Sequence, residues 1–182
     1  METVKCVLVG DPSVGKSWLI TTYITGKNPE GYIPTLFDKS SKEVSREGQK
    51  YSITLWDTAG SDEYKKLRGQ FFQEADVFLI CYAIDNAASF KSTRAWIEEL
   101  SKYNVPMILC GTKCDVIDGD LIDRALPEAL KSEYGLYESI ECSSLELVNV
   151  NKVFCVALDA VLKARRSRAE PAWMWMCCCK CI

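Results

Sequence analysis

The segment GDPSVGKS at residues 10–17 has the residue types and spacing of a phosphate-binding loop. It follows an apolar run at 4–9 and opens a segment of helical period at 16–25, which is the setting that this motif requires. Its glycines let backbone N–H groups wrap phosphate oxygens, Lys16 brings a positive charge to the terminal phosphates, and Ser17 offers a hydroxyl to Mg²⁺. The residues predicted to contact the nucleotide here are Asp11, Pro12, Ser13, Val14, Gly15, Lys16, Ser17 and Trp18.

A second acidic position follows the apolar run YSITLW at residues 51–56. Asp57 stands where phosphate-binding folds hold Mg²⁺ through a water molecule, and a solvated aspartate at a strand end is the alternative interpretation. Gly60 comes three residues later and can offer its N–H to a γ-phosphate, with Ala59 beside it. Together with the upstream loop, these residues predict a site for a nucleoside triphosphate and a magnesium ion.

The segment GTKCD at residues 111–115 indicates which base is bound. A carboxylate at Asp115 can accept hydrogen bonds from the N1–H and the amino group of guanine, whereas adenine has no such pair of donors. The backbone N–H groups of Ser143 and Ser144, in ECSSL after the last predicted strand, can reach the base oxygen. The residues predicted at this end of the site are Thr112, Lys113, Asp115, Ser143, Ser144 and Leu145.

Apolar runs of strand length alternate with segments of helical period along the chain, which predicts a mostly parallel sheet covered on both faces. One exception lies at residues 36–56, where Gly48 in a polar turn predicts an antiparallel hairpin at the sheet edge. We expect a three-layer α/β fold with six strands, one of them antiparallel, and about five helices. The further predicted strands lie at 76–83, 106–111 and 139–142, and the further helices at 89–102, 126–134 and 149–164.

Length and composition fit one compact domain followed by a short tail. The chain has 182 residues and no histidine, which excludes Ser-His-Asp and Cys-His catalysis. Its first residues resemble neither a secretory signal nor a transit peptide, and no run approaches the roughly 20 apolar residues of a membrane span. The net charge is −3 and combines a basic segment at 163–182 with an acidic body, so we expect no nucleic-acid partner.

The ten cysteines form two groups. Cys6, Cys81 and Cys110 lie in or beside apolar runs, which favours buried free thiols in a reducing cytosol over disulfides. The second group crowds the C-terminus, where a zinc site is the competing interpretation, but the chain has no histidine to complete one. The cysteines of this tail are Cys177, Cys178, Cys179 and Cys181.

The order GDPSVGKS, YIPT, DTAG, TKCD and CSS over roughly residues 3–164 resembles a Ras-superfamily small GTPase. The segments KCVLVGD, YIPTLFD, LWDTAG, DVFLICY and IECSS are most similar to the Rho/Rac family. The resemblance implies a G domain over residues 1–164 that binds GTP or GDP and Mg²⁺ and hydrolyses GTP. It also implies that Thr35 reaches Mg²⁺ and the γ-phosphate, and that Tyr32 closes over the phosphates. Switch I would span 27–38 and switch II 58–72, and both would bind effectors.

Two departures from the family pattern affect hydrolysis. Ser61 replaces the glutamine that orients the attacking water in the family, and its hydroxyl is too short to do so. Pro12 replaces a loop glycine, removes one N–H and adds a ring where an arginine finger would enter, although it can also be harmless there. We expect slow intrinsic hydrolysis and a weak response to an activating protein. The predicted catalytic set is Lys16, Thr35, Gly60 and the degenerate Ser61, with Ser17, Thr35 and Asp57 as metal ligands.

Two further departures concern nucleotide exchange and family membership. Asn28 replaces the aromatic residue that packs against guanine in the family, so we expect fast nucleotide exchange and a population biased towards GTP. Only 26 residues separate Asp115 from Cys142, which leaves no room for the additional helix of Rho proteins. The resemblance therefore implies an atypical Rho-like switch, acting in cytoskeletal or membrane-traffic signalling, with an exchange factor and a dissociation inhibitor as further partners.

The C-terminal segment 165–182 predicts attachment to the cytoplasmic face of the plasma membrane or an endomembrane. Cys179 is the fourth residue from the end, as C-a-a-X prenylation requires, but Lys180 is not aliphatic. Double prenylation and palmitoylation of Cys177, Cys178 or Cys181 are the alternatives, and so is a disordered tail. Basic residues with Trp173 and Trp175 suit a lipid interface, since a single lipid chain anchors only weakly.

Two other functions remain open at this stage. A GTP-bound scaffold that never hydrolyses its nucleotide has the same binding motifs as a slow enzyme. A phosphotransferase that uses ATP shares the phosphate loop, but Asp115 argues against it.

Overall fold

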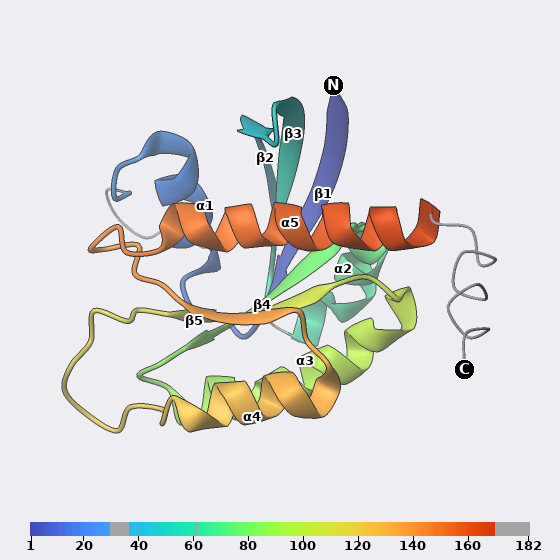
Figure 1. Cartoon of the computed structure of the whole chain (residues 1–182). Coiled ribbons are helices and arrows are strands. Elements are labelled where there is room, and N and C mark those ends of the chain that lie inside the picture. Colours follow the sequence, from blue (N-terminus) through green and yellow to red (C-terminus); the bar gives the residue numbers. More distant parts are fainter. Residues whose placement is uncertain (30–36, 61, 170–182) are drawn as a thin grey trace, which may run out of the picture.

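The computed structural model describes residues 1–29, 37–60 and 62–169. Its sheet has six strands in the order β2-β3-β1-β4-β5-β6 (Figure 1). All neighbours are parallel except β2 and β3, which confirms the predicted α/β sheet with one antiparallel edge strand. The strands are β1 (Glu2–Val9), β2 (Phe37–Arg46), β3 (Gln49–Thr58), β4 (Val77–Ala83), β5 (Met107–Thr112) and β6 (Glu138–Glu141).

Five α-helices cover the two faces of the sheet, with α1 and α5 on one side and α3 and α4 on the other (Figure 1). The sequence pattern predicted the bounds of four of these helices to within a few residues. Helix α2 was not among the predicted helices. Two short 3₁₀ turns, Asp62–Tyr64 and Ser101–Tyr103, adjoin α2 and α3. The helices are α1 (Lys16–Thr25), α2 (Lys65–Phe72), α3 (Ala87–Leu100), α4 (Ala125–Tyr134) and α5 (Val150–Ala169).

Strand β1 shows why its apolar run is nearly continuous. Val4, Cys6 and Leu8 belong to the hydrophobic cluster that α1 and α5 cover. Val7 and Val9 point the other way, into the cluster beneath α2, α3 and α4. Because side chains alternate across a strand, a strand buried on both faces has no position left for a polar side chain at its centre.

The hairpin between β2 and β3 turns at two residues with positive φ, Glu47 at 49° and Gly48 at 77°. Arg46 pairs with Gln49 across this turn, so the loop has two residues. Two-residue loops of this kind match the right-handed twist of the flanking strands. The predicted turn at Gly48 is therefore confirmed.

Helix α5 continues five residues beyond the predicted end at 164, because its last turns are tied to the body. Arg165 pairs with Asp76 at 2.7 Å and with Glu2, and Arg166 pairs with Glu47. Arg168 donates to the backbone oxygen of Asn104 at 2.7 Å. These arginines, assigned by the sequence to the basic tail, thus lie on a docked helix.

The segment between β5 and β6 contains α4 as its single helix, as expected from its short length. Most of residues 117–126 lie exposed at the surface before α4 begins to pack. Across the described ranges, none of the helices combines the length and apolar character needed to cross a membrane. The predicted tail residues 170–182, with their cysteines, lie outside the described residues.

Candidate functional site

A cavity of about 760 Å³ opens at the carboxyl ends of the central strands, where ligands bind in sheets of this type. Its wall is formed by the predicted phosphate loop, by Asp57 near the end of β3 and by the two base-binding segments. Predicted residues on this wall are Pro12, Ser13, Gly15, Lys16, Ser17, Trp18, Asp57, Ala59, Gly60, Thr112, Lys113, Asp115, Ser144 and Leu145. Thr58 and Tyr64 also line the cavity and were not predicted.

The ammonium group of Lys16 lies within the curve of the phosphate loop. It is only 7% exposed and donates to the backbone oxygens of Gly10 at 2.8 Å and Asp11 at 2.9 Å. Burial lowers the pKa of Lys16 from its ordinary value, and the carboxylates of Asp57 and Asp11 act in the opposite direction. The loop therefore presents one confined positive charge to an anionic ligand.

Glycine is required where the phosphate loop leaves β1. Gly10 has φ of 138°, and a Cβ there would lie 2.1 Å from the backbone oxygen of Cys81 on β4. Gly15, the residue before α1, has φ of 96° in the left-handed region. Only glycine adopts such conformations without strain, so the loop can approach the neighbouring strand and still open the helix.

Asp57 at the end of β3 is 4% exposed and lines the cavity with the hydroxyl residue Ser17. Thr58 donates its hydroxyl to the backbone oxygen of Leu8 at 2.6 Å, which holds this strand end beside β1. Carboxylate and hydroxyl oxygens suit Mg²⁺, which commonly binds one or two protein ligands together with water and substrate phosphates. In the described part of the chain, no three His, Cys, Asp or Glu side chains cluster into a self-sufficient metal site.

The base-recognition end is organised by Ser143. Its buried hydroxyl donates to Oδ1 of Asp115 at 2.5 Å and accepts the N–H of Glu146 at 2.9 Å. The prediction for its backbone was wrong, because the N–H of Ser143 is taken by the backbone oxygen of Val148 at 3.0 Å. Ser143 therefore orients the carboxylate from behind, whereas Ser144 and Leu145 line the cavity.

Thr112 connects the phosphate and base segments. Its hydroxyl oxygen lies 2.5 Å from the backbone oxygen of Val14 and 3.0 Å from that of Tyr82. Val14 is buried in the core rather than on the cavity wall, so this predicted contact residue holds the loop in place. The two base segments are joined in turn by the bond from Cys114 N to the backbone oxygen of Cys142, at 3.1 Å.

Gly60 lies directly against the phosphate loop. A Cβ at this position would be 2.3 Å from Gly10 O, 2.5 Å from Asp11 C and 2.6 Å from Pro12 N. A side chain of any kind would therefore collide with backbone atoms, which cannot rotate away. The backbone of residue 60 thus reaches the loop at the place where the sequence predicted a contact with a terminal phosphate.

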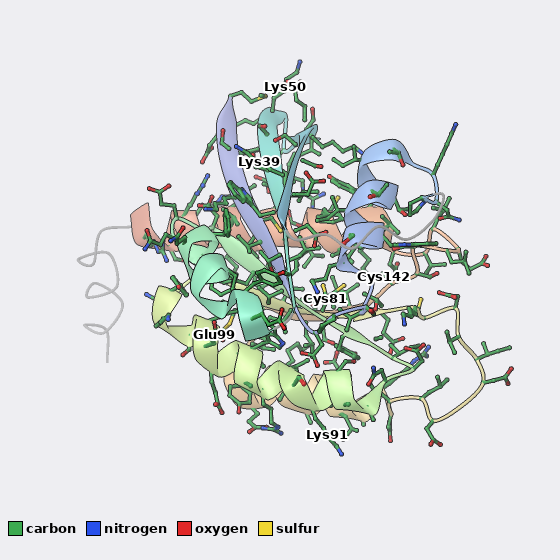
Figure 2. All side chains as sticks on the ribbon, turned by 180° about the vertical axis from the view of Figure 1, so that it is seen from behind. Lys39, Lys50, Cys81, Lys91, Glu99 and Cys142 are labelled. Atoms are coloured by element: carbon green, nitrogen blue, oxygen red, sulfur yellow. The ribbon has the colours of Figure 1, made fainter. Side chains whose placement is uncertain are left out.

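An indole and a guanidinium connect the phosphate loop with α2, a connection that the sequence analysis did not predict. Asp11 is absent from the cavity wall, and its Oδ1 accepts the Nε1–H of Trp96 on α3 at 3.0 Å. The guanidinium of Arg68, 2% exposed on α2, lies 4.3 Å from the centre of the same indole. Arg68 also lies 3.6 Å from the carboxylate of Glu99, which Figure 2 labels on α3. No signal in the sequence pointed to this contact, because the burial of Arg68 is known only from the folded structure.

Asn28 is exposed beside the site and does not line the cavity. Its amide donates to the backbone oxygen of Leu145 at 2.9 Å and so connects the segment after α1 with the base loop. Tyr32, Thr35 and Ser61 lie outside the described residues, and their predicted roles stay predictions.

A sequence model of the Ras family matches residues 5–163, nearly the whole described fold. The chain belongs to the Ras family. Ras-family proteins bind GTP and GDP, generally with Mg²⁺, and hydrolyse GTP, which agrees with the carboxylate of Asp115 and the phosphate loop on one cavity wall. They also bind effectors, exchange factors and dissociation inhibitors. The predicted superfamily is thus confirmed, and the chain is a small GTPase switch.

Proposed function

We propose that this Ras-family chain is a Rho-like switch that hydrolyses GTP slowly, exchanges nucleotide rapidly and is therefore found mainly with GTP bound. The arrangement that carries the proposal is the cavity wall, where Lys16 marks the phosphate end and Asp115, oriented by Ser143, marks the guanine end. The same wall lacks two groups that the family pattern would supply, an aromatic side chain at residue 28 and a glycine at residue 12.

Catalysis in this proposal depends on positioning and charge rather than on a protein nucleophile. Lys16 neutralises charge on the transferred phosphoryl group, and the backbone of Gly60 donates to it. Ser17, Thr35 and Asp57 would hold Mg²⁺, with Asp57 acting through water. When bound, the ion would neutralise the charge that develops on the β- and γ-phosphate oxygens.

Slow hydrolysis is supported by residues 61 and 12. Gly60 packs against the phosphate loop, and Ser61, the next residue, has a hydroxyl too short for the water-orienting role of a glutamine amide. Pro12 is exposed on the cavity wall and lacks an N–H. An arginine finger from an activating protein would have to pass this ring.

Fast exchange is supported by the position of Asn28. Its side chain is exposed, lies off the cavity wall and is engaged with Leu145 O. It offers no ring to a bound purine, so one apolar contact that slows release in the family is missing. Because cells contain more GTP than GDP, both rates shift the population towards the triphosphate form.

The proposed partners follow from the switch mechanism. Effectors would bind residues 27–40 and 58–72, the segments that respond to the γ-phosphate. The Rho-like assignment is supported by the sequence segments YIPTLFD and IECSS, although the single helix between β5 and β6 leaves no Rho insert. We further propose that the tail after the docked end of α5 at Ala169 reaches the cytoplasmic face of a membrane through lipid on Cys179 or its neighbours.

Two rate measurements test this proposal. Single-turnover GTP hydrolysis and GDP dissociation would be followed for the parent, for Ser61→Gln and for Asn28→Phe. We expect Ser61→Gln to speed hydrolysis about tenfold or more with unchanged GDP dissociation, and Asn28→Phe to slow dissociation with unchanged hydrolysis. The proposal is wrong if the parent hydrolyses GTP as fast as Ser61→Gln and releases GDP as slowly as Asn28→Phe.

The alternative is a scaffold that holds GTP without hydrolysing it, which the combination of Ser61 and Pro12 also favours. Phosphate release from the purified GTP complex over several hours separates the two functions. Measurable release that depends on Lys16 supports the slow enzyme, whereas no release above the buffer blank supports the scaffold.

A further inference from the structure

The described part of the cavity wall contains two aromatic residues, Trp18 and Tyr64. Tyr64 ends the 3₁₀ turn after Gly60 and so belongs to the switch II segment near the phosphate end. Trp18 lies in the first turn of α1, directly after Ser17, and is half-buried. Of these two aromatic residues, Trp18 comes from helix α1, whereas Tyr64 comes from the switch II segment.

The packing of Trp18 is unusual for so large an apolar side chain. Its neighbours Leu19 and Ile20 are buried in the cluster beneath α1 and α5, but Trp18 belongs to neither hydrophobic cluster. Within the described ranges, its indole also forms no ring pair with another aromatic residue, unlike Tyr23 on the same helix, which stacks on Phe154. The indole thus faces the cavity with an apolar surface that the protein core does not use.

The position of Trp18 along the cavity indicates what this surface would meet. Lys16 and Ser17 define the phosphate end, and Trp18, the next residue of α1, lines the same cavity. Asp115 and Leu145 define the base end of the same cavity. A guanine nucleotide that spans these two ends would extend along the wall to which Trp18 contributes.

We propose that Trp18 supplies the aromatic contact to the sugar and purine of the bound guanine nucleotide, the contact that Asn28 does not provide. The proposal rests on the nucleotide-binding function proposed above. It gives Trp18 the role of slowing nucleotide release without selecting the base. Any purine offers a π-face and an apolar edge, so an indole there slows release without selecting the base. Selection remains with Asp115, and Asn28 contacts the base loop through its hydrogen bond to Leu145 O.

This assignment changes the expected exchange behaviour. The chain releases GDP faster than it would with a ring at residue 28, but Trp18 keeps the release from becoming faster still. Removing Trp18 should therefore increase the GDP dissociation rate about tenfold, which corresponds to about 1.4 kcal/mol. Trp18→Phe keeps an aromatic face and should stay within about threefold of the parent.

The experiment uses the full chain loaded with GDP that carries a methylanthraniloyl group on its ribose, displaced by excess unlabelled GDP. Parent, Trp18→Ala, Trp18→Phe and the control Trp56→Phe would be compared, and Trp56 does not line the cavity. We expect fast release from Trp18→Ala alone. We also expect energy transfer from tryptophan to the ribose label to fall in both Trp18 variants and to persist in Trp56→Phe.

Release from Trp18→Ala at the parental rate would overturn the proposal, and so would unchanged energy transfer in Trp18→Phe. Trp18→Phe guards against a variant that fails to fold, since it preserves ring volume and still removes the indole donor of energy transfer. Failure of the parent itself to retain labelled GDP would instead contradict the proposed nucleotide-binding function. The two failures are thus distinguishable.

Discussion

The indole Nε1–H of Trp96 donates to Oδ1 of Asp11 at 3.0 Å, which connects the middle of α3 to the phosphate loop. The other partner of this indole is the guanidinium of Arg68 on α2, 4.3 Å from the ring centre. One side chain therefore contacts both the loop that binds phosphate and the helix of switch II.

Trp96→Phe tests this connection, since phenylalanine keeps a ring for Arg68 and removes only the donor to Asp11. Loss of a hydrogen bond to a partly exposed carboxylate should lower the free energy of unfolding by about 1 kcal/mol. GDP dissociation should also become about threefold to fivefold faster, because the phosphate loop loses a restraint. Urea unfolding and nucleotide release would be measured beside Trp56→Phe. Identical behaviour of the two variants would exclude a role for the Asp11 bond.

Gly60→Ala should disrupt the contact between switch II and the phosphate loop, because its Cβ would lie 2.3 Å from Gly10 O. The backbone of residue 60 must then move away, so we expect faster amide hydrogen exchange at residues 10–12 and 60. Gly69→Ala is the matched control, since nothing lies within 4 Å of a Cβ there. In the helix interior this control should be neutral or stabilising by up to about 1 kcal/mol. Equal exchange protection in both variants would contradict the close approach.

Ser143→Ala should weaken GDP binding about tenfold without altering the cavity wall. The hydroxyl of Ser143 donates to Asp115 at 2.5 Å from outside the cavity, so its loss frees the carboxylate to rotate. Calorimetric titration with GDP and ADP would measure the change, with Ser132→Ala on the exposed face of α4 as control. Asp115→Ala should abolish the preference for GDP over ADP altogether. Retained preference in Asp115→Ala would refute the assignment of the base site.

The buried thiols should resist alkylation up to mildly alkaline pH. Burial raises the pKa of Cys6, and hydrogen bonding with Cys142 and Cys81 together with burial raises the pKa of Cys110. Because the thiolate is the reactive form, these thiols should stay unmodified between pH 7 and 9, whereas the exposed Cys155 is accessible to the reagent. Figure 2 shows Cys81 and Cys142, two further buried thiols, in the interior of the molecule.

Peptide mass spectrometry after iodoacetamide treatment would measure this order of modification. Urea provides the control, since unfolding should make all the thiols of the body react at similar rates. Modification of Cys6 or Cys110 in the folded protein as fast as that of Cys155 would show that the strands open readily.

Chelation of Mg²⁺ should accelerate GDP release about tenfold or more, because the phosphate charge is then held by Lys16 and backbone N–H groups alone. The effect should disappear in Asp57→Ala, which lacks the buried carboxylate of the proposed metal site. Asp118→Asn, exposed and off the cavity wall, should respond to chelation like the parent. A chelation effect of parental size in Asp57→Ala would place the ion elsewhere.

Local rules predicted the elements that interact mainly with their own neighbours. Helix α1 has the predicted bounds of 16–25, since a glycine in the left-handed region lies at each end. The hairpin turn at Gly48 likewise depends on two residues alone. Helix α2 was missed because its eight residues, KKLRGQFF, are few and include only three apolar side chains. The ion pairs of Arg165 and Arg166 extend α5 beyond its apolar pattern.

The amino-acid sequence by itself determined the ligand chemistry, because GDPSVGKS, Asp57 and TKCD are short segments whose function depends on spacing within the segment. Only the tertiary structure decided which side chains support them. Ser143 behind Asp115, Trp96 on Asp11 and Gly60 against the phosphate loop join residues that are 28 to 85 positions apart or meet across different strands. Such contacts depend on how strands and helices pack, and no local pattern of residues encodes that packing.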